Sequence, residues 1–213
     1  MIIKSKLCLL LLLLIIFNCC MTQKKYSVYN ESNINDSYMK NMKFDIEAFN
    51  KNRQGRDSYK FIQNNMEIEQ TKLKKIYVEY IKPIDKFYNI YNEYYLNGNL
   101  KVHGIRLNDG VSLGGLHIKT WEYYDEQGNL IRKVDEDARF GNVPFDYNRV
   151  ILWLDKKGCI NIKEGKTYTN FYSISFNSEK KYWQIDINDE YKIYLLDGKT
   201  GKIIGVGEIN PIK

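Results

Sequence analysis

Two segments in the middle of the chain carry nearly the same pattern, and this pattern is typical of β-hairpins. Residues 93–101 read EYYLNGNLK and residues 122–130 read EYYDEQGNL, which places Leu100 and Leu130 at equivalent positions. Each unit has an aromatic pair that favours a strand, a tight turn in which glycine supplies the positive φ, and a leucine that begins a second strand. The repeat therefore predicts two hairpins lying side by side as a small antiparallel meander.

The longer pattern, EYYLNGNLK followed by GGLHIKTWEYYDEQGNLIRK, resembles the MORN-variant repeats of a family of antitoxins from toxin–antitoxin systems. The shared features are the aromatic pair, the Asx-Gly turn and the Leu-Lys that follows. The resemblance covers roughly 45 of the 213 residues. It implies a protein that binds another protein, in one version an immunity protein that neutralises a toxin in the periplasm.

Aromatic side chains of these hairpins are the candidate binding residues. Tyrosine and tryptophan provide a large contact area at low entropic cost, and they are enriched at interfaces. Half-buried strands also favour tyrosine, so the same residues could serve the sheet alone. The residues that we expect on a binding face are Tyr94, Tyr95, Trp121, Tyr123 and Tyr124.

The last third of the chain predicts one helix followed by strands. Asp146 is suited to an N-cap, residues 147–157 carry Val150, Ile151 and Leu154 on one face, and Gly158 stands where a helix C-terminus favours glycine. Three strand-like runs follow at 169–176, 181–187 and 191–196. In the second run Trp183, Ile185 and Ile187 share one face, and residues 197–201 (DGKTG) form a hairpin turn. Cys159, just after the helix, is expected to be a small buried apolar residue.

The stretch YWQIDINDEYKIYLLDGKTGKII, together with the preceding helix, resembles PepSY-like domains of secreted bacterial proteins. This likeness implies an independent module in which one helix packs on an antiparallel sheet. It also implies an alternative function, the modulation of a secreted peptidase.

The first half of the mature chain predicts a short helix and further strands. Met39, Met42, Ile46 and Phe49 recur at spacings of three and four, which is typical of an amphipathic helix over 37–50 with Ser37 as its N-cap. Strand patterns follow near 59–62, 66–69 and 74–81. Helices and strands in separate stretches predict an α+β fold.

The N-terminus predicts an export signal with a lipid anchor. Lys4 and Lys6 precede an apolar run, 7–17, that is too short to span a bilayer and has the length of a signal-peptide core. The residues Ile16-Phe17-Asn18-Cys19 resemble the lipobox of bacterial lipoproteins, although Asn18 departs from the usual small residue before the cleavage point. This resemblance implies lipidation of Cys19, with Cys20 as the alternative acceptor. An ordinary secretory signal is the other reading.

A lipidated Cys19 would make the membrane the first partner of this protein. Several acyl chains hold a protein stably on a bilayer, whereas a single chain does so only marginally. We therefore expect a protein anchored in the bacterial cell envelope, at the periplasmic face of the outer membrane.

Composition supplies little evidence for a nucleic-acid partner. Ile, Lys, Asn and Tyr make up 92 of 213 residues, and all four have AT-rich codons. The net charge is +6, and removing Lys4 and Lys6 with the signal lowers it to +4. Because nucleic-acid binders usually concentrate Arg and Lys on one face, this diffuse surplus predicts no nucleic-acid partner.

No arrangement of residues predicts catalysis. Residues 110–114 (GVSLG) match the nucleophile-elbow pattern, with Ser112 as the nucleophile and His117 nearby. The elbow requires a strand-to-helix turn, whereas residues 115–119 continue as a strand. His103 and His117 are the only histidines, and two histidines alone do not define a metal site. We expect no enzyme activity, no cofactor and no metal.

The sequence thus predicts five regions. They are a lipoprotein signal peptide (1–18), a flexible tether (19–36), an N-terminal helix with strands (37–90), MORN-variant-like hairpins (91–140) and a PepSY-like module (141–213). The predicted function is that of a non-enzymatic, membrane-anchored, protein-binding lipoprotein. A structural envelope lipoprotein without a dedicated partner is a further alternative.

Overall fold

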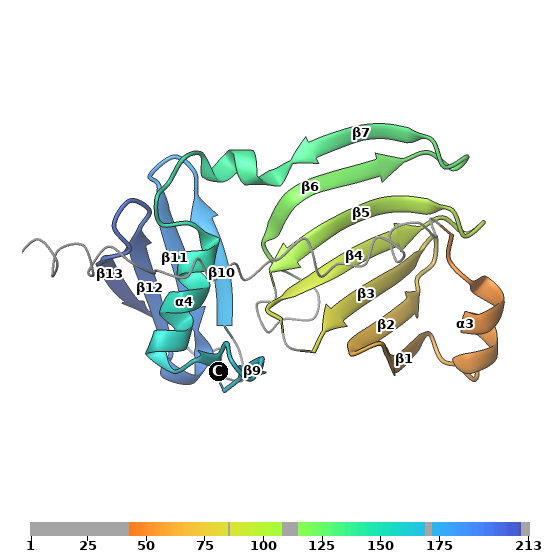
Figure 1. The fold of residues 1–213 in the computed structure, drawn as a ribbon, viewed down its shortest axis with the longest axis horizontal. Coiled ribbons are helices and arrows are strands. Elements are labelled where there is room, and N and C mark those ends of the chain that lie inside the picture. Colours follow the sequence, from red (N-terminus) through yellow and green to blue (C-terminus); the bar gives the residue numbers. More distant parts are fainter. Residues whose placement is uncertain (1–42, 85, 108–114, 169–171, 210–213) are drawn as a thin grey trace, which may run out of the picture.

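A seven-stranded antiparallel sheet dominates the computed structural model, which describes residues 43–84, 86–107, 115–168 and 172–209. Its strands follow one another in chain order, and each pairs with the next. They are β1 (Ser58–Gln63), β2 (Met66–Lys72), β3 (Tyr77–Pro83), β4 (Tyr88–Tyr94), β5 (Leu100–Leu107), β6 (His117–Tyr124) and β7 (Leu130–Asp135). Figure 1 shows this meander with helix α3 (Ile46–Asn52) at one end of its strands.

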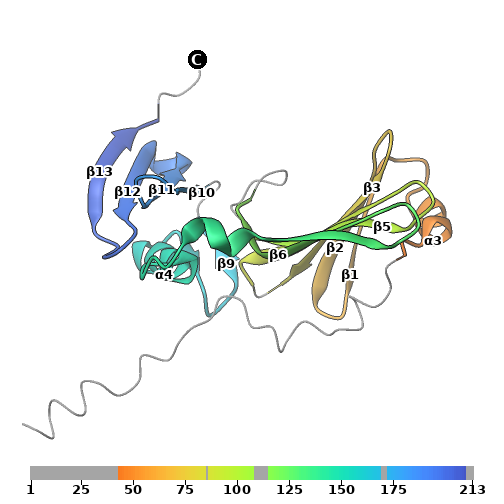
Figure 2. The ribbon, with the colours of Figure 1, turned by 90° about the horizontal axis from the view of Figure 1, so that it is seen from above.

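A smaller antiparallel sheet lies at the other end of the long strands (Figures 1 and 2). It contains β10 (Tyr172–Asn177), β11 (Tyr182–Ile187), β12 (Lys192–Asp197) and β13 (Ile203–Glu208). Helix α4 (Tyr147–Lys157) packs on this sheet, and the short strands β8 (Ile160–Asn161) and β9 (Lys166–Thr167) follow it. The described part of the chain also has two 3-10 helices, η2 (Glu136–Phe140), between β7 and α4, and η3 (Asn188–Glu190), between β11 and β12.

The predicted α+β fold class is wrong, because the chain forms a β-rich fold built mainly of antiparallel sheet. The early strands do not stand apart from the hairpins, since β3 pairs with β4 and joins both groups in one sheet. The C-terminal helix and sheet are also not an independent PepSY-like module. Val150 and Ile151 of α4 share one hydrophobic core with Tyr88, Leu107 and Ile118 of the large sheet.

The local predictions for the two hairpins are confirmed. β4 pairs with β5, and β6 pairs with β7, both in antiparallel register. The two turns are equivalent in detail, because Gly98 and Gly128 both adopt positive φ and donate their N–H to the carbonyl oxygens of Tyr95 and Asp125. The first turn also contacts the second, since the Asn99 amide donates to the carbonyl oxygen of Glu126 at 2.7 Å.

The two α-helices of the described residues differ in how well the sequence located them. α4 begins at its predicted cap, where the Asp146 carboxylate accepts a hydrogen bond from the Arg149 N–H, and it ends at Gly158 with φ 82°. α3 begins later than the amphipathic spacing suggested. The Asp45 carboxylate caps it by accepting from the Ala48 N–H at 2.9 Å. The predicted cap, Ser37, lies outside the described residues.

Candidate functional site

Helix α3 packs against one face of the seven-stranded sheet, which we call the helix face. Phe49 of α3 is 1% exposed, and it meets Tyr77 of β3 edge-on. Phe44, just before the helix, stacks on Tyr77 with 4.6 Å between ring centroids and also contacts Tyr94 of β4. These contacts fix α3 across the ends of the strands.

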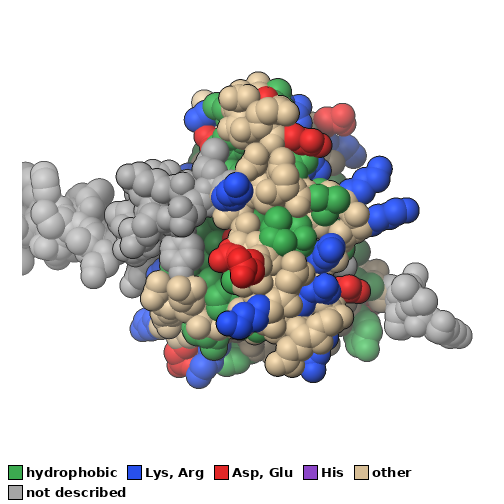
Figure 3. Space-filling model, turned by 90° about the vertical axis from the view of Figure 1, so that its right-hand side faces the viewer, with side chains coloured by type: hydrophobic (Ala, Val, Ile, Leu, Met, Phe, Trp, Pro, Cys, Tyr) green, Lys and Arg blue, Asp and Glu red, His purple; other side chains and the backbone are tan. Residues whose placement is uncertain are grey.

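A groove of about 700 Å³ lies between α3 and the helix face. That volume falls within the usual range of ligand sites in proteins. Figure 3 looks onto this end of the molecule, where Lys and Arg side chains project around a surface of mixed character. Five aromatic side chains line the groove: Phe44, Phe49, Tyr59, Phe61 and Tyr94.

A carboxylate, that of Glu79 on β3, lies among these aromatic rings. Three neutral groups donate hydrogen bonds to it: the Gln70 amide at 2.8 Å, the Asn92 amide at 3.2 Å and the Tyr94 hydroxyl at 3.0 Å. The donors come from both neighbouring strands, so the sheet itself orients the carboxylate. Burial and the charge of Glu79 raise the pKa of Tyr94 well above its usual value, which keeps this hydroxyl protonated as a donor.

Glu79 belongs to a row of polar side chains that crosses the helix face at right angles to the strands. Its members are directly opposed in the strand register, so they share one face. Beyond Glu79, the Asn92 amide oxygen accepts a hydrogen bond from His103 Nδ1 at 2.8 Å, and Lys133 donates to Glu122 at 2.6 Å. The complete row is Tyr59, Gln70, Glu79, Asn92, His103, Glu122 and Lys133.

The centre of this row is buried, because Asn92 is 6% exposed and His103 is 9% exposed. Burial lowers the pKa of His103, against the opposing influence of the Glu122 charge. His103 is therefore neutral at physiological pH and can serve as a hydrogen-bonding partner of Asn92. Side-chain hydrogen bonds thus join four consecutive members of the row, from Gln70 at the groove through Glu79 and Asn92 to His103.

The opposite face of the sheet carries a second cluster of aromatic and basic residues. The Trp121 indole lies directly over Gly104 of β5 and is 2% exposed. The Arg106 guanidinium lies 3.6 Å from the centre of the Tyr91 ring, and the His117 imidazole stacks on Trp121 at 3.7 Å. These contacts make the cluster a packed layer, with Trp121 beneath the two basic side chains.

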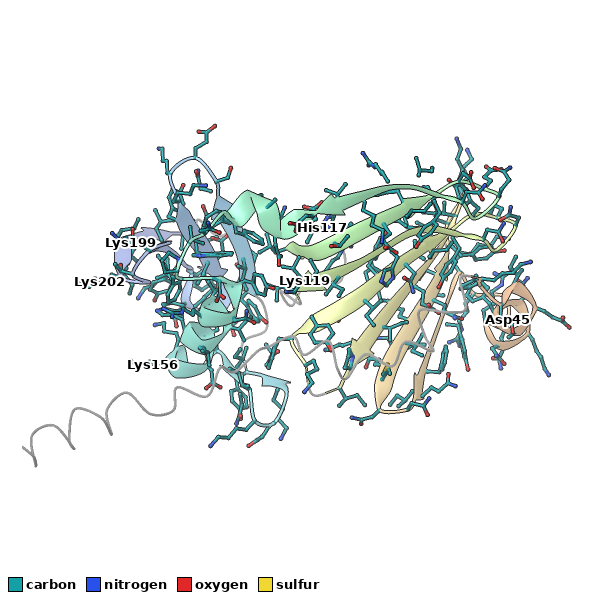
Figure 4. All side chains as sticks on the ribbon, turned by 45° about the horizontal axis from the view of Figure 1, so that its top comes forward. Asp45, His117, Lys119, Lys156, Lys199 and Lys202 are labelled. Atoms are coloured by element: carbon teal, nitrogen blue, oxygen red, sulfur yellow. The ribbon has the colours of Figure 1, made fainter. Side chains whose placement is uncertain are left out.

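Charged residues near His117 connect this cluster to η2. Burial, with the charges of Arg106 and Arg139, lowers the pKa of His117 to about 4. Glu136 approaches the His117 ring at 3.9 Å, and Lys119 pairs with Asp137 at 3.5 Å. Figure 4 places His117 and Lys119 on β6, far from Asp45 beside the groove and from Lys199 and Lys202 at the β12–β13 turn.

The structure divides the five predicted binding aromatics between the two faces. Tyr94 and Tyr124 belong to the buried cluster under α3, whereas Trp121 and Tyr123 belong to the layer on the opposite face. Tyr95 donates its hydroxyl to the carbonyl oxygen of Tyr124. One of the five, Tyr94, lines the groove.

Three other predicted residues, Cys19, Cys20 and Ser112, lie outside the described residues. His117, the proposed partner of Ser112, is stacked on Trp121. In the described ranges no group of three or more His, Cys, Asp or Glu side chains is placed to hold a metal ion. Within the same ranges, no helix has both the length and the apolar character needed to cross a membrane.

Apart from Tyr94, sequence reasoning missed the residues that form the groove, although Glu79 could have been found. In the run KKIYVEYI, Glu79 occupies the same face of the strand as Tyr77 and Ile81, which are both buried. A carboxylate at an inward position of a strand needs partners, so it marks a site worth examining. Gln70 and Asn92 carried no comparable signal, because their role depends on the register between strands.

Comparison of this chain with protein-family models, curated proteins and solved structures found no match.

Proposed function

We propose that this protein is a non-enzymatic, lipid-anchored binding protein of the bacterial envelope, and that the groove beside α3 takes part of a protein partner. The observation that carries this proposal is the groove itself. It combines aromatic walls with a hydrogen-bonded carboxylate, Glu79, at its floor. Sites with a few oriented polar groups among apolar walls are typical of specific binding.

Two aromatic side chains of the groove leave surface that a partner can cover. On the opposite face, Trp121 and Tyr91 are buried beneath Arg106 and His117, so their rings are already engaged. In the groove, Tyr59 and Phe61 remain half-buried and stack on each other at 5.1 Å. A partner can therefore bury more of the Tyr59 and Phe61 rings.

The proposed anchor is a lipid on Cys19, in accord with the lipobox-like residues 16–19. Replacing Cys19 with Ser should move the protein from the membrane fraction to the soluble fraction, whereas Cys20→Ser should leave it in the membrane fraction. Immunoblotting of the two fractions measures this. A Cys19→Ser protein that stays with the membranes would contradict the assignment.

Affinity capture from detergent-solubilised membranes, with Cys19 intact, tests the binding function. Tyr59→Ala removes a groove wall, and Tyr123→Ala is a matched control because it removes a half-buried tyrosine from the opposite face. We expect a stoichiometric partner with the unaltered chain and with Tyr123→Ala, and its loss with Tyr59→Ala. Capture of no partner would favour a structural envelope lipoprotein. Loss only with Tyr123→Ala would place binding on the opposite face.

The resemblance of residues 93–130 to antitoxin repeats favours one version of this function, the immunity of a cell to a toxin. A captured partner that inhibits growth when it is expressed in the periplasm alone, and is harmless when it is co-expressed with this protein, would establish that version. A captured partner that is harmless in both conditions would refute it.

A further inference from the structure

The chemistry of the groove allows the binding partner to be specified further. Among the described residues, three charged side chains line the groove: Lys43, Asp45 and Glu79. Their formal charges sum to −1. Asp45 already caps α3, and the described part of the chain places no Lys, Arg or His nitrogen within 4.0 Å of the Glu79 carboxylate. Glu79 is thus held by neutral donors and lacks a counter-ion there.

The Glu79 carboxylate can accept more hydrogen bonds than the three that it receives. A carboxylate offers about four acceptor sites on its two oxygens. Gln70 occupies one site on Oε1, while Asn92 and Tyr94 bond to Oε2. Oε1 therefore retains room for a further donor, and a cationic donor would add the Coulomb attraction of opposite charges to the hydrogen bond.

The walls of the groove suit the same kind of ligand. Aromatic rings attract cations electrostatically through the negative charge of their faces, and the attraction grows as water is excluded. Tyr59 and Phe61 stack on one side of Glu79, from strand β1, and Phe44 and Phe49 come from the α3 side. An anion among several aromatic rings would repel acidic ligands and would leave neutral ones without a charge partner.

We propose that the groove binds a Lys or Arg side chain of a basic peptide segment, with the Glu79 carboxylate as its counter-ion and the aromatic side chains around its alkyl stem. This inference rests on the binding function proposed above. In the bound state the ammonium or guanidinium donates to Glu79 Oε1, while the methylene groups of the stem pack against the half-buried rings of Tyr59 and Phe61. The remainder of the peptide lies outside the groove.

A pair of short peptides tests this directly. The probe is fluorescein-labelled Gly-Arg-Gly-Arg-Gly-amide, and its counterpart has citrulline, a neutral isostere, in place of both arginines. Fluorescence anisotropy with the detergent-solubilised full chain should give at least tenfold tighter binding of the arginine peptide, which corresponds to about 1.4 kcal/mol. The preference should shrink as salt is raised. Equal affinity for the two peptides would overturn the inference.

The Glu79→Gln variant tests whether the preference for the arginine peptide depends on the Glu79 carboxylate. The glutamine amide keeps the size of the side chain and removes its charge, so the preference for arginine over citrulline should fall below threefold. The matched control is Glu69→Gln, which removes a carboxylate from β2 on the opposite face and should leave the preference unchanged. A Glu79→Gln protein that still prefers arginine tenfold would refute the role of this carboxylate. Should this variant fail to fold, the peptide pair with the unaltered chain still decides the matter.

The peptide experiment and the membrane capture can refute their two proposals separately. A partner captured through Tyr59, combined with equal affinity for the two peptides, would retain the binding function and refute the cationic ligand. Arginine-selective peptide binding without a captured partner would retain the cation site and refute the function as a protein-binding lipoprotein.

Discussion

Gly104 is the position where a single methyl group should disturb the large sheet most. The Trp121 indole lies on this glycine, so that a Cβ atom added at residue 104 would come within 2.2 Å of two indole carbons and within 2.7 Å of a third. Carbon atoms in contact prefer about 3.5–4.0 Å. Gly104→Ala therefore forces the indole to move by roughly 1.3–1.8 Å, or forces β5 and β6 to separate.

The cost of that movement can be estimated from the contacts of the indole. Trp121 is 2% exposed, and its Nε1–H donates to the carbonyl oxygen of Ile105 at 3.2 Å. Overpacking of a tight core costs about 1–3 kcal/mol. Displacement of the indole also weakens its buried hydrogen bond, which adds about 1 kcal/mol. We expect a loss of about 2–4 kcal/mol, a large part of the total stability of about 5–15 kcal/mol that is typical of folded proteins.

Urea unfolding followed by tryptophan fluorescence measures this loss, and Gly207→Ala is the matched control. Gly207 is also a strand glycine, but the nearest atom to an added Cβ would be 3.7 Å away, which is an ordinary contact. Its substitution should change stability by less than about 0.5 kcal/mol. In a Trp121→Leu background, Gly104→Ala should cost at least about 1 kcal/mol less than in the original chain. Equal effects of the two glycine substitutions would refute the packing argument.

Three further predictions concern single side chains. Asp146→Ala should lower the free energy of unfolding by about 1 kcal/mol because it removes the N-cap of α4, whereas Asp146→Asn should retain most of it, as measured by urea unfolding. The pKa of His117 is lowered to about 4, whereas an unfolded histidine titrates near 6.5, so the unfolded chain binds the extra proton between these values. The contribution of His117 to stability should therefore be present above pH 6.5 and decline toward pH 4, and His117→Gln should flatten that part of the curve. Burial raises the pKa of the Cys159 thiol to about 11, so in a chain lacking the other cysteines it should react with a thiol reagent at pH 8 only after unfolding; rapid reaction of the folded protein would contradict this.

The parts of the fold that the sequence predicted well depend on short-range rules. The turn at residues 197–201 is one example, because the Asp197 carboxylate accepts from the N–H groups of Lys199 and Thr200 three residues or fewer away. The alternation in β11 is another, since Trp183, Ile185 and Ile187 are all fully buried. Such features depend only on residues that are close together in the sequence.

The groove could not be predicted in the same way, because it depends on pairings between separate strands. Alternation shows that Glu79 faces the same side as Tyr77, but it does not show that Gln70 and Asn92 lie opposite Glu79. The α+β prediction failed for the same reason. Each segment was interpreted by itself, whereas the pairing of β3 with β4 merges two predicted regions into one sheet.

A comparison of two adjacent rows on the helix face indicates that the polar row serves the binding of a ligand. One row is apolar throughout and consists of directly opposed side chains: Phe61, Ile68, Ile81, Ile90, Ile105 and Ile118. Five of its members, all isoleucines, are at most 5% exposed, which shows that this face can be built from isoleucine. The neighbouring row places Glu79, Asn92 and His103 in the same kind of environment. Buried hydrogen bonds between such groups add little net stability over apolar packing, because each group loses its water. A row that contributes little to stability and holds an oriented carboxylate in a groove therefore favours the proposed cationic ligand over a purely structural role.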